Sequence, residues 1–146
     1  MSSDVSTDGV DPESATSQAI SGANDVMVAE VVAAAHAYER ALVDGDGPGA
    51  AAFFAEDGDI SRFGPEGAQF GREAVVALRT SYPQVAAPAW VDEQARVLAP
   101  GVVVHLAVLQ RGDTVVQRTQ LWKHDGTSWR IHHAHVSRLA APRGIS

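Results

Sequence analysis

Polar side chains recur at every second position of a run near the end of the sequence, residues 114–123. Because side chains alternate across a β-strand, one face of this run carries three of them together: Arg118, Gln120 and Trp122. Such a face combines apolar bulk with a few donors and acceptors, which is what the wall of a small-molecule pocket requires. We therefore expect these three side chains to contact a ligand.

A second run, residues 129–139, shows the same alternation. It places one set of side chains on a shared face: Trp129, Ile131, His133, His135 and Ser137. His135 and His133 are candidate pocket groups here, and Trp90, on an earlier extended stretch, is a further one. A Trp or His on a buried strand is more often a core residue than a ligand group. Both interpretations stay open for each of these positions.

Arg62 stands between Ser61 and Phe63, without charged neighbours. Its guanidinium offers a fixed fork of donors that matches a carboxylate, a task for which lysine is less suited. We interpret it as a clamp for an anionic group. An arginine in this setting can also reach solvent from a strand edge or pair with a structural carboxylate.

Tyr38 lies on the apolar face of an expected helix over residues 25–44, with Asn24 or Asp25 as its cap. Large apolar residues recur there at steps of three and four: Val28, Val31, Val32, Ala35, Tyr38 and Leu42. Residues 1–24 hold almost no large apolar groups, and we expect a disordered tail. Residues 141–146 form a second, short tail.

The remaining elements follow in order between these points. Pro48 suits the first turn of a short helix to about residue 55, and Gly71-Arg72 opens a third helix that Pro83 ends. Extended segments are expected at 60–64, 90–98, 102–110, 114–123 and 129–139, the last two joined by a tight turn at Asp125-Gly126. Helices followed by consecutive strands predict one α+β domain over residues 25–140, with three helices packed on a curved antiparallel sheet.

Composition excludes several classes of function. The 146 residues contain no cysteine, which excludes disulfides and thiolate catalysis, and no apolar run approaches the roughly 18 residues of a membrane span. No secretory signal pattern is present, so we expect a cytoplasmic protein without a membrane partner. The net charge of -7 includes five acids within residues 1–25, and no basic stripe supports nucleic-acid binding. His133 and His135 lack a third ligand, so we expect no metal or other cofactor.

Several short motifs together resemble one family. They are Tyr38-Glu39-Arg40-Ala41-Leu42, Arg62-Phe63-Gly64 with Glu66, Gly71-Arg72-Glu73-Ala74, Thr119-Gln120-Leu121-Trp122, and the segment from Trp129 to Ser137. Their order over about residues 26–140 resembles the nuclear transport factor 2-like, or SnoaL-like, cone fold, also called cystatin-like. Within that fold the motifs are most similar to the AtzH-like group.

This resemblance implies an activity. AtzH-type enzymes act on small carboxylated ureas as decarboxylating amidohydrolases, through a tyrosine of the first helix and an arginine of the Arg-Phe-Gly segment. The matching residues here are Tyr38 and Arg62, and a phenol near neutral pH would donate a hydrogen bond rather than abstract a proton. The segment Gln117-Arg118-Thr119-Gln120 replaces the expected Arg-Gln-Ser-Gln, which leaves the substrate open.

Two other classes of function remain for this fold. An isomerase or cyclase of the SnoaL or ketosteroid-isomerase type needs a carboxylate base, yet residues 114–123 and 129–139 contain no acid. The resemblance also extends to a non-catalytic ligand-binding or dimerising module, as in the association domain of calcium/calmodulin-dependent protein kinase II. Such folds commonly pair through the outer sheet face, so we expect a homodimer, with Val103, Val115 and Leu121 supplying apolar area.

Overall fold

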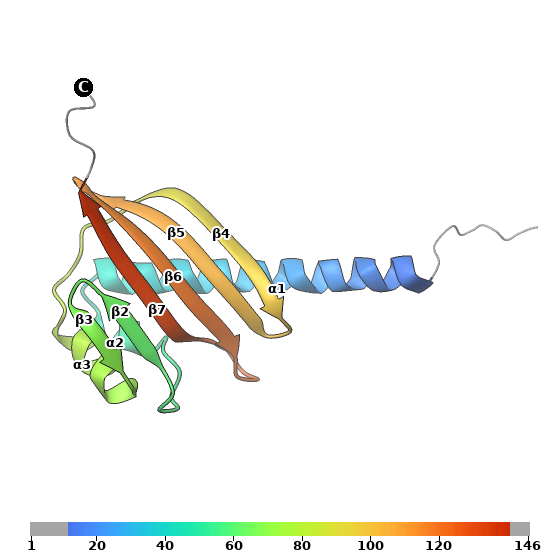
Figure 1. The fold of residues 1–146 in the computed structure, drawn as a ribbon, viewed down its shortest axis with the longest axis horizontal. Coiled ribbons are helices and arrows are strands. Elements are labelled where there is room, and N and C mark those ends of the chain that lie inside the picture. Colours follow the sequence, from blue (N-terminus) through green and yellow to red (C-terminus); the bar gives the residue numbers. More distant parts are fainter. Residues whose placement is uncertain (1–11, 141–146) are drawn as a thin grey trace, which may run out of the picture.

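The first helix, α1 (Pro12–Val43), lies across the concave side of a curved sheet (Figure 1). The computed structural model describes residues 12–140. Val31, Ala35 and Tyr38, spaced by four and three residues, are at most 3% exposed. The apolar face predicted from the sequence is therefore the face that packs on the sheet.

The helix starts earlier than predicted, because α1 begins at Pro12 rather than near Asp25. Side chains from Ser14 to Ala23 are exposed, and this part projects beyond the sheet (Figure 1). The lack of apolar residues indicated a segment without packing, but backbone hydrogen bonds within a helix need none, and proline suits a first turn. The prediction of disorder for residues 12–24 was wrong, and residues 1–11 lie outside the described part of the chain.

Two shorter helices close one end of the sheet. In α2 (Gly47–Ala51) the carboxylate of Asp46 caps the first turn by accepting from the backbone N–H of Gly49 at 2.9 Å. The start of α2 lies against the end of α3 (Arg72–Ser81), and a Cβ on Gly47 would come within 2.6 Å of the Arg79 carbonyl oxygen. Glycine at this position is what lets the two helices meet.

One six-stranded sheet forms the rest of the fold, in the order β3-β2-β7-β6-β5-β4. The strands are β2 (Ser61–Gly64), β3 (Gly67–Phe70), β4 (Ala89–Ala99), β5 (Val102–Arg111), β6 (Thr114–His124) and β7 (Trp129–Ala140). The predicted four-strand meander is β4 to β7. β3 has no counterpart among the predicted strands, and the predicted sheet is antiparallel throughout, whereas β2 and β7 run parallel. The α+β class and the cone shape are confirmed.

A β-bulge in β7 reverses the predicted faces of that strand. Trp122 of β6 pairs with Ile131, and the residue before it, Leu121, pairs with His133. His132 therefore has no partner on β6 and is an extra residue in β7. Beyond the bulge Ala134 faces the core at 2% exposure, while His133 and His135 lie on the other face. The prediction that both histidines share the inner face with Ile131 was wrong, because strict alternation takes no account of an inserted residue.

The two sheet faces differ in burial. The inner face contributes Val103, Trp122 and Ile131 to the core, each 0% exposed. Val103 therefore cannot serve the outer face as predicted, whereas Val115 and Leu121 are half-buried. None of the helices within residues 12–140 is long and apolar enough to cross a membrane.

Lysine substitutions at neighbouring positions of β7 test the bulge. Ala134→Lys buries a charge in the core and should lower the free energy of unfolding by about 3 kcal/mol or more. In His135→Lys the new charge lies in solvent, and the free energy of unfolding should change by less than about 1 kcal/mol. Urea denaturation followed by tryptophan fluorescence measures both, and the reverse order would show that β7 alternates without a bulge.

Candidate functional site

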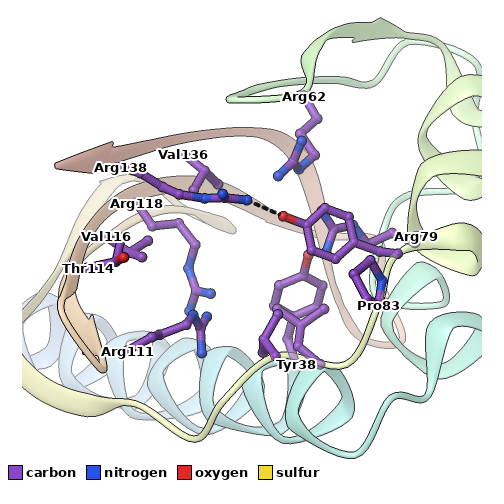
Figure 2. Close-up of a pocket in the computed structure, with 13 residues that line it drawn as sticks. Tyr38, Arg62, Arg79, Pro83, Arg111, Thr114, Val116, Arg118, Val136 and Arg138 are labelled. Atoms are coloured by element: carbon purple, nitrogen blue, oxygen red, sulfur yellow. Dashed lines mark hydrogen bonds between the residues drawn. The ribbon is translucent and has the colours of Figure 1, made fainter. Parts of the chain in front are cut away.

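A cavity of about 280 Å³ opens between α1, the end of α3 and the inner face of β5 to β7 (Figure 2). Its lining combines aromatic and aliphatic side chains with five arginines: Tyr38, Leu42, Arg62, Arg79, Tyr82, Pro83, Val85, Arg111, Thr114, Val116, Arg118, Val136 and Arg138. None of these lining residues is Asp or Glu. The cavity is therefore strongly positive, and its size suits a small ligand.

One buried carboxylate neutralises part of this charge. Glu39, on α1 and 3% exposed, accepts two hydrogen bonds from Arg111 and one from Arg118 at 2.8 Å. Burial acts to raise the pKa of Glu39, but the hydrogen bonds and charges of the two arginines outweigh it and hold that pKa below its usual value. We call these three residues the Glu39 triad.

A second carboxylate lies on the β2–β3 side of the cavity. Glu66 accepts from Arg62 at 2.9 Å, and Arg138 lies 3.5 Å from its other oxygen. Partial burial acts to raise the pKa of Glu66, but hydrogen bonds from Tyr82 and Arg62 lower it to about 2. The hydroxyl of Tyr82 also accepts from Arg138 at 2.6 Å. We call Glu66, Arg62 and Arg138 the Glu66 triad.

Arg79 has no carboxylate partner. It is 3% exposed, and within residues 14–139 no acid lies at ion-pair distance from its guanidinium. Its Nε has no hydrogen-bond acceptor, and its charge lies 4.8 Å from the centre of the Tyr82 ring. Burial lowers the pKa of Arg79, yet a guanidinium stays charged at neutral pH. A buried cation without a counter-ion costs free energy, which an anionic ligand would recover.

Arg118 is also only partly satisfied. One of its nitrogens donates to Glu39, but its Nε and its second terminal nitrogen are buried without an acceptor. The guanidinium carbon lies 5.6 Å from the centre of the Tyr38 ring. Buried donors in native proteins nearly always have partners, and these two N–H groups have none among the described protein atoms.

Tyr38 stands in the middle of these charges. Its ring packs edge-to-face on Phe53 and Phe54, with centroids 5.8 and 6.0 Å apart. This packing fixes the ring, and the phenol oxygen points from α1 toward the side of the cavity where Arg62 and Arg79 lie (Figure 2). A phenol held beside these arginines can donate a hydrogen bond to a polar group in the cavity.

A separate polar cluster lies outside the cavity lining, between α1, β4 and β5. Glu93 accepts from His105 at 2.7 Å and from His36 at 2.9 Å, and His36 stacks on Trp90 with centroids 3.9 Å apart. Burial lowers the pKa of His105, although the hydrogen bond to Glu93 acts to raise it. The lowered pKa favours the neutral imidazole. Trp90, a predicted pocket residue, thus belongs to this cluster.

The structure brings together only some of the predicted site residues. Tyr38, Arg62 and Arg118 line the cavity. Gln120 and Trp122 are on the inner face as expected but form part of the core, where the indole N–H of Trp122 donates to Gln120 at 3.1 Å.

His133 and His135, two of the three histidines of β7, do not line the cavity. His133 accepts or donates a 2.8 Å hydrogen bond with the hydroxyl of Ser61, and the rings of both His133 and His135 pack on Phe63. Ser61 and Phe63 of β2 are the strand partners of His133 and His135. These contacts therefore lie on the outer face of the sheet, with the two histidines. No group of three or more His, Asp or Glu residues within the described part is arranged to hold a metal ion.

Three cavity arginines and Tyr82 are absent from the predicted site residues. Arg79 follows Val75 by four residues on the buried side of α3, so an arginine on an apolar helix face was a usable signal. Arg111 lies at a turn and Arg138 lies beyond the bulge, and no local pattern places either of them in the cavity.

Known proteins share this fold and part of this sequence. The AtzH-like family model matches residues 22–142. A protein of unknown function from Pectobacterium atrosepticum is similar, with 26% identity over 77% of this chain and 91% of that chain, at a TM-score of 0.71. A cystatin-like fold protein from Burkholderia xenovorans gives 27% identity over 78% and 92%, at a TM-score of 0.72.

A solved structure of lower identity has the same fold. A nuclear transport factor 2-like protein of unknown function from Pseudomonas putida has 19% identity over 77% of this chain and 87% of that chain, at a TM-score of 0.64. At that identity the likeness shows the fold alone. None of the curated proteins matches this chain.

The pKa of Glu66 predicts a pH dependence of stability. Because folding lowers this pKa from 4.5 to about 2, the Glu66 triad contributes stability above pH 4.5 that is lost as the pH falls toward 2. The gap in unfolding free energy between the parent and Glu66→Gln should therefore be widest above pH 4.5 and close near pH 2. Chemical denaturation at several pH values measures it, with Glu73→Gln, an exposed acid of α3, as the matched control. A gap that does not change with pH would contradict the assignment.

Proposed function

Because the chain belongs to the AtzH-like family, we propose that its arginine-lined cavity binds and converts a small carboxylated molecule. The reaction would be that of a decarboxylating amidohydrolase acting on a carboxylated urea or amide. Membership of the nuclear transport factor 2-like superfamily fits a small-molecule-binding or catalytic protein. The arginines and Tyr38 of the cavity are the groups that would bind the substrate and take part in its reaction.

The observation that carries this proposal is the buried, unpaired Arg79. A protein rarely keeps a guanidinium at 3% exposure without a carboxylate. The cost of that burial is offset when an anion enters the cavity and takes the place of the missing counter-ion. Arginine also binds a carboxylate through two parallel hydrogen bonds, which fixes the orientation of the ligand.

Arg62 and Tyr38 would have different roles, the first in binding the substrate and the second in its reaction. One terminal nitrogen of Arg62 donates to Glu66 at 2.9 Å and to the side-chain oxygen of Gln69 at 3.2 Å, so the guanidinium is held in place before substrate arrives. It would bind and orient the carboxylate. The phenol of Tyr38 would then donate a hydrogen bond to the oxygen or nitrogen that gains charge at the reacting centre.

An isomerase or cyclase mechanism has less support from this site. It needs a carboxylate that can take a proton near neutral pH, but Asp and Glu are absent from the described lining of the cavity. Glu39 and Glu66 lie just behind the arginines, and both carboxylates already accept hydrogen bonds from them. With a pKa of about 2, Glu66 would be a poor base.

A direct assay separates the enzyme from a binding module. The purified protein would be incubated with carboxylated ureas, amides and β-keto acids, and released carbon dioxide and ammonia would be measured. Calorimetry with the same compounds would run in parallel. Binding with turnover supports the proposal, binding without turnover favours a ligand-binding module, and the absence of binding would refute a carboxylate site.

Two conservative substitutions should affect turnover and binding differently. Tyr38→Phe should lower kcat about a hundredfold or more while leaving KM nearly unchanged, since the lost hydrogen bond acts mainly in the transition state. Arg62→Lys should first raise KM, because a point charge replaces a fork of donors. Steady-state kinetics on a substrate that the parent converts measures both.

The matched control for these variants is Arg40→Lys, at an exposed arginine of α1 that lies outside the cavity lining. It should keep the kinetic constants of the parent. If Tyr38→Phe and Arg62→Lys also kept full activity, the reaction would take place elsewhere on the protein.

We also propose that two copies of the chain pair through the outer sheet face. The outward side chains of β5 form an apolar strip that is only half-buried in one chain: Val102, Val104, Leu106 and Val108. Leu121 of β6 lies beside the strip, while Asp92 and Arg96 border it on β4 with opposite charges. A second copy in the opposite orientation could match both the apolar strip and the charges.

Sedimentation at micromolar concentration tests this pairing. The parent should show a sedimentation mass twice the 15.3 kDa of one chain. The variant Leu106→Glu should show the mass of a single chain, because a charge would be buried in the interface. A parent that sediments as a single chain at that concentration would rule out the homodimer.

A further inference from the structure

The side chains that line the cavity differ in exposure, and the exposed ones mark its mouth. The deep wall consists of side chains that are at most 4% exposed: Tyr38, Arg62, Arg79 and Arg118. Other lining residues are half-buried or exposed, and they lie on the loop after α3 and near the end of β7: Tyr82, Pro83, Val85 and Arg138. The mouth of the cavity therefore lies between that loop and β7.

The loop, residues 82–88, joins α3 to β4 and is fixed to the rest of the fold along its length. The backbone N–H of Val85 donates to the carbonyl of Leu42 on α1 at 3.3 Å. Arg111 of β5 donates to the carbonyl of Ala86 at 3.0 Å. Because these bonds hold the loop backbone on α1 and on the sheet, access at this mouth depends on side chains.

One hydrogen bond between side chains spans the mouth. The guanidinium of Arg138 on β7 donates to the hydroxyl of Tyr82 on the loop at 2.6 Å, and the dashed line in Figure 2 marks this bond. Glu66, in the turn between β2 and β3, lies 3.5 Å from the same guanidinium. We call the bond between Tyr82 and Arg138 the latch.

The latch holds an aromatic ring over part of the deep wall. The ring of Tyr82 lies above the guanidinium of Arg79, with 4.8 Å between the guanidinium carbon and the centre of the ring. With the ring in this position, Arg79 is only 3% exposed. The bond from Arg138 therefore fixes a side chain that separates the deep wall from solvent.

The latch is easier to break than the contacts of the deep wall. The side chain of Arg138 is 50% exposed, and polar pairs at exposed positions contribute little to stability because water competes for them. Exposed side chains also change rotamer within nanoseconds. The latch can thus open and re-form while the loop backbone and the core stay in place.

We propose that Tyr82 and Arg138 form a side-chain gate that selects by size the molecules that enter the cavity. Small molecules pass beside the closed latch, whereas larger ones enter only when it opens. This inference rests on the proposed function in one respect, that the cavity is the binding site. It depends neither on the chemical class of the ligand nor on turnover.

Because the chain contains no cysteine, a single introduced thiol can report access to the cavity. Val116→Cys places it at a buried position of the lining, and Thr114→Cys supplies a second reporter there. Ala77→Cys, at an exposed position of α3 outside the lining, is the control reporter.

Each reporter would be combined with a substitution in the latch. Tyr82→Phe removes the hydroxyl but keeps the ring, and Arg138→Met removes the donors but keeps most of the side-chain length. Arg40→Met, at an exposed arginine of α1 outside the lining, is the matched control. Mass spectrometry would follow alkylation of the thiol by iodoacetamide, a small reagent, and by the larger N-phenylmaleimide.

The latch variants should admit the larger reagent faster. Tyr82→Phe and Arg138→Met should each speed the labelling of the cavity thiols by N-phenylmaleimide about threefold or more, because the closed form loses the bond that stabilises it. Labelling by iodoacetamide should change less. Arg40→Met should keep the rates of the parent, and the Ala77→Cys thiol should react at one rate in all variants.

Several results would overturn the gate. These are unchanged labelling of the cavity thiols in both latch variants, cavity thiols that stay unreactive in every variant, and equal acceleration with both reagents. Faster labelling in Arg40→Met or at Ala77→Cys would indicate general loosening and would overturn it as well.

The labelling rates also separate the gate from the proposed function. A protein that shows the expected rates but binds and converts no carboxylated compound would keep the gate and lose the proposed function. A protein that converts such a compound but labels at unchanged rates would lose the gate alone.

Discussion

The carboxylate of Glu39 is the constraint on which the rest of the structure depends. A negative charge at 3% exposure on α1 must be neutralised where it lies, and only the end of β5 and the middle of β6 supply arginines to do so. These ion pairs fix the helix on the concave face of the sheet. They also place two guanidinium groups at the cavity wall, so the contact that orients α1 supplies part of the binding site.

The opposite end of the cavity repeats this arrangement with different elements. Glu66, in the turn between β2 and β3, holds Arg62 and Arg138, and thereby ties the parallel edge of the sheet to β7. Arg79 adds a cation that nothing in residues 14–139 balances. The excess positive charge at the cavity wall is electrostatically unfavourable, and the fold offsets it through the apolar packing of Tyr38, Phe54, Trp122 and Ile131. Under the proposed function, a bound carboxylate would restore the stability that is given up here.

Local patterns in the sequence predicted most of the elements, and their failures have physical causes. Helical spacing placed Tyr38 inward, and strand alternation placed Arg118 on the inner face, because both depend only on backbone periodicity. His133 and His135 were misplaced, since a bulge is set by pairing with a neighbouring strand. Arg111 was missed because its position in the cavity follows from the packing of α1 on the sheet, which no local pattern encodes.

The bulge at His132 has a further consequence for how such a pocket could diversify. If the residues after Ile131 shifted by one position along β6, so that His132 paired with Leu121, β7 would alternate without a bulge, and the rest of the strand would present its opposite side to the cavity. Val136 and Arg138 would leave the wall, while His135 and Ser137 would enter it. A shift of one residue in strand pairing could thus exchange a cationic wall for a neutral, hydrogen-bonding one without any substitution. Within one fold, the register of a strand would then determine which ligand charge the pocket prefers as much as the identity of its residues does.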